Sequence, residues 1–183
     1  MANKDAAFGL KPIGKIGQNR DNQGLSEYDI AASASAIFFQ DPVEMAATGT
    51  ITVAAASDTL LGSLTGVFFT DASTEKPTFA NHLNASNTAT DIKGFVADDP
   101  YERFEVQADG ATAAADVGLN ADIVYASGSS PDFISKVELQ TSDQKTGTAQ
   151  LRILGISKDP DNNTAGSANV NLVVLINEHQ LKA

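Results

Sequence analysis

The chain has 183 residues, a formal net charge of -11 and no cysteine. This length suits one domain with an extension, and the lack of cysteine excludes disulfides, thiolate metal sites and cysteine nucleophiles. The acidic surplus disfavours binding to nucleic acid and to anionic membranes. The longest run of large aliphatic residues is "LVVLI" at 172–176, far short of the roughly 20 residues of a membrane span. No secretory signal is recognisable at the N-terminus, so we expect a soluble protein made in the cytoplasm.

Residues 1–24 are predicted to form an extended N-terminal arm. This segment carries a net charge of +2, whereas residues 25–183 carry -13. An extended segment can lay apolar anchors into shallow grooves or add a strand to a sheet edge, while basic residues meet acidic groups. The alternative is a disordered or self-packed terminus. The candidate residues for binding a capsid or a neighbouring subunit are Phe8, Leu10, Lys11, Ile13, Lys15, Ile16 and Arg20.

Residues 25–183 are predicted to form a single β-rich domain, because apolar and polar residues alternate as in half-exposed antiparallel strands. In "RFEVQA" at 103–108, we expect the apolar residues to face the core and Arg103, Glu105 and Gln107 to face solvent. The last two predicted strands carry apolar residues on both faces and should be central. In chain order the predicted strands are 26–30, 36–40, 50–53, 64–70, 92–97, 103–108, 136–140, 150–157 and 169–177.

The segments between these strands give turn and loop signals and little helix. The one helix signal is 111–118, a single turn or a short helix ended by Gly118. The polar stretch 74–91 is predicted to be a long loop or protruding flap. Gly66 and Gly94 fall inside strands, where glycine often marks a bulge or bend. The predicted fold is therefore all-β, an antiparallel β-sandwich or small β-barrel with an extended N-terminal arm and little helix.

The chain offers no convergent set of nucleophile, base and orienting group. For His82 and His179, surface or structural roles are favoured over catalysis. Asp98 and Asp99 could bind a cation, but a turn is favoured because neighbouring side chains on an extended backbone point apart. The loop 159–166 opens like a calcium loop yet lacks the required glycine and glutamate, so a solvated loop is favoured. We expect no enzymatic activity, no metal site and no cofactor.

Two pairs of adjacent aromatic residues suggest that some strands are covered on both faces. In "IFF" at 37–39 and "VFF" at 67–69, neighbouring rings point to opposite faces of a strand. At least one ring of each pair therefore faces away from a single-sided core. The sequence is compatible with an inter-sheet core and with a subunit interface.

Several segments resemble the decoration, or cement, proteins of tailed bacteriophage capsids, particularly those of marine and cyanobacterial phages. The resemblance is carried by "MANKDAAFGLKPI" at the start, "AIFFQDPVEM" at 36–45, "ADDPYERFEVQADG" at 97–110, "AADVGLNADI" at 114–123 and "VLINEHQL" at the end. It implies a β-rich virion protein on the outer capsid surface that bridges neighbouring major capsid proteins and stabilises the mature head. It also implies self-association as a homotrimer or dimer.

Two other functions are considered beside the capsid role. One is a tail or head-fibre component or a carbohydrate-binding β-module of the virion, which would need an exposed aromatic platform; Tyr101, Tyr125 and Phe133 are too dispersed in the sequence to identify one. The other is an enzyme of unrecognised type, which the missing catalytic constellation disfavours.

Overall fold

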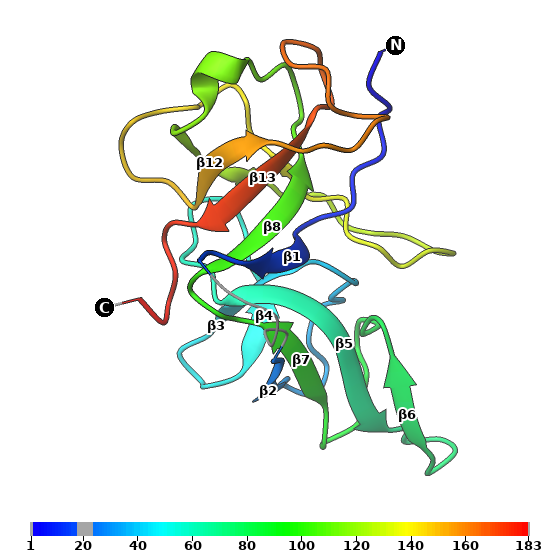
Figure 1. Ribbon diagram of the computed structural model, residues 1–183. Coiled ribbons are helices and arrows are strands. Elements are labelled where there is room, and N and C mark those ends of the chain that lie inside the picture. The colour runs from blue at the N-terminus through cyan, green and yellow to red at the C-terminus, as the bar shows by residue number, and fades with distance from the viewer. Residues whose placement is uncertain (1, 18–23, 183) are drawn as a thin grey trace.

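A computed structural model describes residues 2–17 and 24–182 of the chain. These residues form two antiparallel sheets, which are the upper and lower halves of Figure 1. The predicted all-β fold with little helix is confirmed, since the one helical element described is the short 3-10 turn η1 (Ala114–Asp116). Neither sheet closes into a barrel within the described ranges, and the architecture is consistent with a β-sandwich. No helix in this part of the chain is long and apolar enough to cross a membrane.

The upper sheet has five strands in the order β1-β8-β13-β12-β9. Their bounds are β1 Lys11–Lys15, β8 Glu102–Gln107, β9 Asn120–Ala121, β12 Leu151–Ile156 and β13 Asn171–Ile176. A two-stranded ribbon of β10 (Ile123–Val124) and β11 (Glu138–Leu139) contributes to the same core. Phe104, Val106, Leu151 and Val174 are fully buried in this upper core, as the alternation along these strands predicts.

The lower sheet has the order β2-β7-β5-β3-β4, with β6 also paired to β5. Its strands are β2 Ser26–Asp29, β3 Pro42–Met45, β4 Ile51–Val53, β5 Gly62–Thr70, β6 Pro77–Ala80 and β7 Lys93–Ala97. A second apolar cluster, which includes Ile37, Leu64, Leu83 and Val96, lies under this sheet. The long strand β5 is strongly curved (Figure 1), and its register shifts between Leu64 and Gly66. The bulge predicted at Gly66 is thus confirmed.

Most predicted strands are present, with shifts at their ends. The segment 36–40 makes isolated bridges through Ile37 and Phe39 instead of a continuous strand. The prediction of a long loop or protruding flap at 74–91 missed the strand β6, which lies inside this stretch. Strands β1, β3, β9 and β10 were not predicted.

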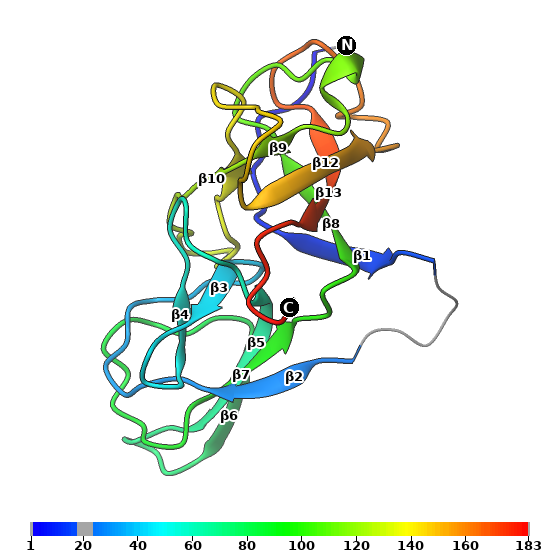
Figure 2. The same ribbon diagram turned by 90° about the vertical axis from the view of Figure 1, so that its left-hand side faces the viewer.

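The N-terminal segment lies against the chain's own upper sheet, where β1 pairs antiparallel with β8 (Figure 2). The backbone N–H of Leu10 donates to the Gln40 carbonyl at 2.9 Å, and the Ser63 hydroxyl donates to the Leu10 carbonyl at 2.6 Å. Gly9 has a φ of +77°, and a Cβ there would lie 2.2 Å from the Gln40 carbonyl oxygen. Glycine is therefore required for this close approach.

The N-terminal segment also covers polar residues that were expected to face solvent. Gln107 is buried because its side chain accepts from the Ala6 N–H and donates to the Lys4 carbonyl, both at 2.9 Å. Glu105 is buried as well, and it accepts hydrogen bonds from Lys11 and Ser157. The prediction that these two side chains face solvent is wrong, because the arm packs over the polar face of β8.

Candidate interaction surface

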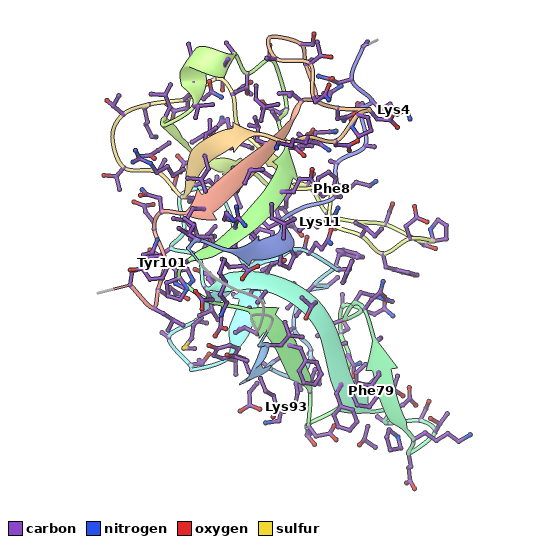
Figure 3. All side chains as sticks on the ribbon, viewed as in Figure 1. Lys4, Phe8, Lys11, Phe79, Lys93 and Tyr101 are labelled. Carbon is purple, nitrogen blue, oxygen red and sulfur yellow. The ribbon has the colours of Figure 1, made fainter. Side chains whose placement is uncertain are left out.

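The outer face of the lower sheet carries three phenylalanine rings, which we call the aromatic face: Phe68 on β5, Phe79 on β6 and Phe95 on β7. The ring centroids of Phe68 and Phe79 are 4.8 Å apart, and those of Phe79 and Phe95 are 6.5 Å apart with nearly parallel planes. Phe79 is 74% exposed and projects from the lower sheet in Figure 3. A contiguous group of exposed aromatic side chains is typical of a binding surface.

Strand register brings these rings together. Phe68 lies directly opposite Phe79, and Phe95 lies opposite Gly66 on the other side of β5. Because Gly66 has no side chain, the rings of Phe79 and Phe95 can approach each other above the backbone of β5. A Cβ at Gly66 would also lie 3.3 Å from the Ala80 carbonyl oxygen. Gly66 therefore lies at the register shift of β5 and leaves room for the rings of the aromatic face.

Charged residues border the aromatic face on the β2 side. The Lys93 ammonium lies 2.7 Å from an Asp29 carboxylate oxygen and 3.4 Å from one of Glu27. The hydrogen bond to Asp29 is the main cause of the raised pKa of Lys93. These exposed ion pairs contribute little to stability, but they give the border a net negative charge.

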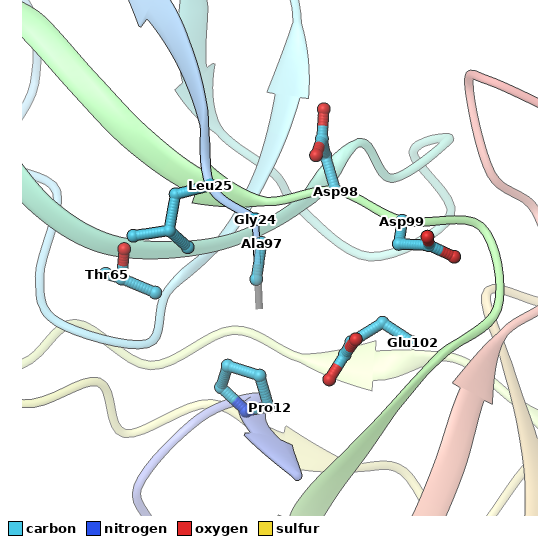
Figure 4. Close-up of a pocket in the computed structure, with 8 residues that line it drawn as sticks. All are labelled: Pro12, Gly24, Leu25, Thr65, Ala97, Asp98, Asp99 and Glu102. Carbon is cyan, nitrogen blue, oxygen red and sulfur yellow. The ribbon is translucent and has the colours of Figure 1, made fainter. Parts of the chain in front are cut away.

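A pocket of about 230 Å³ adjoins the aromatic face and contains three carboxylates; we call it the acidic pocket (Figure 4). Its lining residues are Pro12, Gly24, Leu25, Thr65, Ala97, Asp98, Asp99 and Glu102. Leu25 and Thr65 also line the hollow beside Phe79 and Phe95. The acidic pocket therefore lies next to the aromatic face, with Leu25 and Thr65 between the two hollows.

Two of the three carboxylates in the acidic pocket have no cationic partner in the described part of the chain. Asp98 accepts from the hydroxyls of Ser26 at 2.9 Å and Tyr28 at 2.6 Å. Burial, followed by the bond to Asp98, raises the pKa of Tyr28 to about 12. Glu102 accepts from the Gly14 N–H at 2.9 Å, and burial raises its pKa.

The third carboxylate is paired with the N-terminal segment. The Lys15 ammonium lies 2.6 Å from Asp99, and this bond is the main cause of the lowered pKa of Asp99. The Asp99 side chain also accepts from the Tyr101 N–H, and the Asp99 carbonyl accepts from the Glu102 N–H. The predicted turn at Asp98 and Asp99 is confirmed, with the two carboxylates pointing to different partners (Figure 4).

The structure does not gather the predicted arm residues into one surface. Leu10 is fully buried in the upper core, where it has no surface to offer a partner in this conformation. Ile13 and Ile16 are 39% and 46% exposed, and they stay predicted contact residues. The other predicted residues divide as follows: Phe8 is half-buried, Lys11 pairs with Glu105, Lys15 pairs with Asp99, and Arg20 lies outside the described residues.

Both histidines are packed against other groups of the chain. The His82 ring stacks on Phe133 with centroids 3.9 Å apart, and burial lowers its pKa. His179 is buried, its Nδ1 accepts from the Leu181 N–H at 3.0 Å, and burial is the main cause of its lowered pKa. Within residues 2–17 and 24–182, no three His, Asp or Glu side chains are grouped as a metal site would need.

The loop 158–168 is more than a solvated loop, because it holds the N-terminal segment. Asn162 is buried, and its side chain accepts from the Lys4 N–H at 2.9 Å and donates to the Lys4 carbonyl at 2.8 Å. The Lys4 ammonium also lies 2.5 Å from Asp161.

Sequence reasoning missed the aromatic face. The "VFF" pair indicated that one ring faces away from the core, and Phe68 is that outward ring. The register that places Phe79 beside it was hidden, since Phe79 lies in the stretch predicted to be a flap. In comparisons with known protein families, curated proteins and solved structures, nothing matches this chain.

Proposed function

We propose that this chain is a structural virion protein that binds the outer surface of a tailed-phage capsid and cements neighbouring major capsid proteins. The phage setting rests on the sequence resemblance described above. The binding role is supported by one structural observation, the aromatic face, in which Phe79 is exposed and Phe68 and Phe95 are half-buried beside it. Exposed aromatic anchors supply much of the binding energy where they enter a partner's pockets.

The architecture suits a clamp that acts through many copies. A decoration protein needs only modest affinity for each contact, because a repeating lattice and self-association as a trimer or dimer add avidity. Ile13 is exposed on the edge strand β1 and Ile16 directly after it, in the other sheet from the aromatic face. Two apolar surfaces on different sheets would let one molecule touch two neighbours, either a major capsid protein or another copy.

A carbohydrate-binding module or fibre component is the second candidate, since it would need an exposed aromatic platform and Phe79 is exposed next to two half-buried rings. The platform consists of phenylalanine, however, and lacks the polar ring atoms of tyrosine or tryptophan. Apolar rings of this kind favour a protein partner over a sugar.

Quantitative mass spectrometry of purified virions tests the capsid role. We expect on the order of hundreds of copies per particle, as the symmetry of a capsid lattice requires. A handful of copies would assign the chain to the tail or fibre class instead.

Binding to empty shells then tests the surface. Phe79→Ser should reduce co-sedimentation with shells by roughly tenfold or more, the loss expected for an interface anchor. Val117→Ser is the matched control, because Val117 is also exposed but lies next to η1 in the upper half of the molecule. Equal binding by the two variants would exclude the aromatic face from the contact.

A further inference from the structure

We propose that the aromatic face and the acidic pocket form one groove that binds an extended peptide carrying an apolar side chain and a lysine or arginine about four residues apart. This inference rests on the proposed function in one respect, that the peptide belongs to the major capsid protein. The chemistry of the groove is argued from its own residues and is testable without a capsid.

The hollow beside the aromatic rings and the acidic pocket share two lining residues. Leu25 and Thr65 line both the hollow beside Phe79 and the acidic pocket, so the two hollows adjoin at these side chains. Leu25 is itself 48% exposed, which extends the apolar floor from the rings toward the carboxylates.

The geometry of β7 sets the spacing. Phe95 and Ala97 are alternate residues of β7 and therefore share its outer face. The chain then continues directly to Asp98 and Asp99. At about 3.3 Å per residue, Phe95 and Asp99 are roughly 13 Å apart along the backbone. An extended peptide covers this distance with about four residues, and side chains four positions apart point to the same side.

Charge decides what the far end of the groove accepts. Among the described residues, Lys15 is the one cation that forms an ion pair with these three acidic residues, and Asp98 and Glu102 are only 9% and 3% exposed. Carboxylates with so little access to water gain from a cation that enters the pocket and repel an anion. The guanidinium of arginine suits such a site because its planar donors can bind one carboxylate through two hydrogen bonds. Asp29 and Glu27 at the border of the aromatic face add to the same preference.

A synthetic peptide, acetyl-Gly-Phe-Ser-Thr-Ser-Arg-Gly-amide, provides the test. Titrated into the full chain at about pH 7.5 and low salt, where charges are weakly screened, it should shift the amide NMR signals of Leu25, Thr65, Gly66 and Phe95. Glu in place of Arg should weaken binding by roughly tenfold or more, since a charge-assisted hydrogen bond is lost and repulsion replaces it. Ser in place of Phe should weaken it by a similar factor.

Two variants assign the two ends of the groove. Phe79→Ser should abolish the preference for the Phe peptide, and Glu102→Gln, which keeps an acceptor for the Gly14 N–H, should reduce the preference for Arg over Glu. Val117→Ser should bind like the unchanged chain. Native-like amide spectra for each variant exclude misfolding as the reason for lost binding.

Equal binding of the Arg and Glu peptides, or signal shifts confined to other surfaces, would overturn the inference. Self-association of the chain without peptide, seen in analytical ultracentrifugation and covering the groove, would overturn it as well. Peptide binding by a chain that is scarce in virions would overturn the capsid role and leave the groove intact. A chain that decorates shells abundantly but binds the Arg and Glu peptides equally would support the capsid role and overturn the groove.

Discussion

Asp41 is a buried carboxyl group at the point where the N-terminal segment meets the lower sheet. Its side chain has no measurable exposure; Oδ2 accepts from the Phe38 N–H at 2.7 Å, and Oδ1 has no hydrogen-bond partner. Burial raises the pKa of Asp41 from 3.8 to about 6, although the Phe38 N–H and the nearby Ser135 hydroxyl oppose the shift. The folded chain therefore holds the Asp41 proton up to a higher pH than the unfolded chain does.

This preference predicts the direction of a pH effect. Because the pKa of Asp41 is higher in the folded chain, its contribution to the free energy of unfolding is fully present below about pH 4 and is lost as pH rises through about 6. A shift of about two units corresponds to about 2–3 kcal/mol. Asp41→Asn removes the titration, so urea unfolding of both proteins should show the wild type losing about that much relative to the variant between about pH 4.5 and about pH 7.5. A constant difference between the two proteins would refute the assignment.

Individual residues also show where local sequence patterns stop being informative. Alternation correctly placed Phe104 and Val106 in the core. The same pattern assigned Glu105 and Gln107 to solvent, because a period of two tells which residues share a face but not what covers that face. The covering segment is about 100 positions away in the chain, and its glycine-rich, basic composition resembles that of a free arm.

At the scale of elements, β1 is the part of the arm that the fold uses. It pairs with β8 and forms one edge of the upper sheet. Leu10, directly before β1, packs into the upper core. We expect Leu10→Ala to lower the free energy of unfolding by about 2–5 kcal/mol, as for other fully buried leucines. Ile13→Ala, in the exposed part of the same strand, should cost less than about 1 kcal/mol.

Guanidinium unfolding of the two variants measures this difference. Equal and small effects would mean that the segment is a detachable arm, as its composition suggests, and that Leu10 is free to anchor a partner. A large effect at Leu10 alone would confine partner contacts of the segment to Ile13, Ile16 and the half-buried Phe8.

Strand β6 is an element that the sequence pattern did not predict. The stretch 74–91 is polar and rich in turn formers, and Pro77 would weaken any strand. The stretch nevertheless adds β6 at an edge, where proline is tolerated and where cross-strand contact between Phe68 and Phe79 stabilises the pairing. The aromatic face depends on the register of this pair of consecutive strands, which the polar, turn-rich composition of the stretch conceals.

At the scale of the whole molecule, the two sheets have separate apolar clusters, and the segment after β13 connects them. The Leu60 N–H donates to the Glu178 carbonyl, and the Gln180 N–H donates to the Leu60 carbonyl, both at 2.9 Å. The Gln180 side chain then accepts from the Met45 N–H at 2.7 Å and donates to the Met45 carbonyl at 3.2 Å. Gln180 thus fastens the end of the upper sheet's β13 to β3 of the lower sheet.

This connection bears on the prediction that residues 25–183 form a single domain. Separate cores would allow the sheets to open independently, whereas a strong connection would make them unfold together. Gln180→Ala removes two hydrogen bonds to a backbone unit and should cost about 1–3 kcal/mol. Hydrogen exchange should show the loss first at the Met45 amide, with the amides of β12 still protected.

Gln144→Ala is a suitable control, because Gln144 makes one side-chain hydrogen bond, to Thr112, and lies outside the connection. If Gln180→Ala lowers protection equally in both sheets and unfolding stays a single transition, the sheets form one cooperative unit. If the amides of β5, which do not bond to Gln180, exchange faster while those of β12 do not change, the lower sheet opens on its own. A lower sheet able to open in this way would let the aromatic face adjust to a partner without unfolding the upper sheet, whereas a single cooperative unit would present that face as a rigid surface.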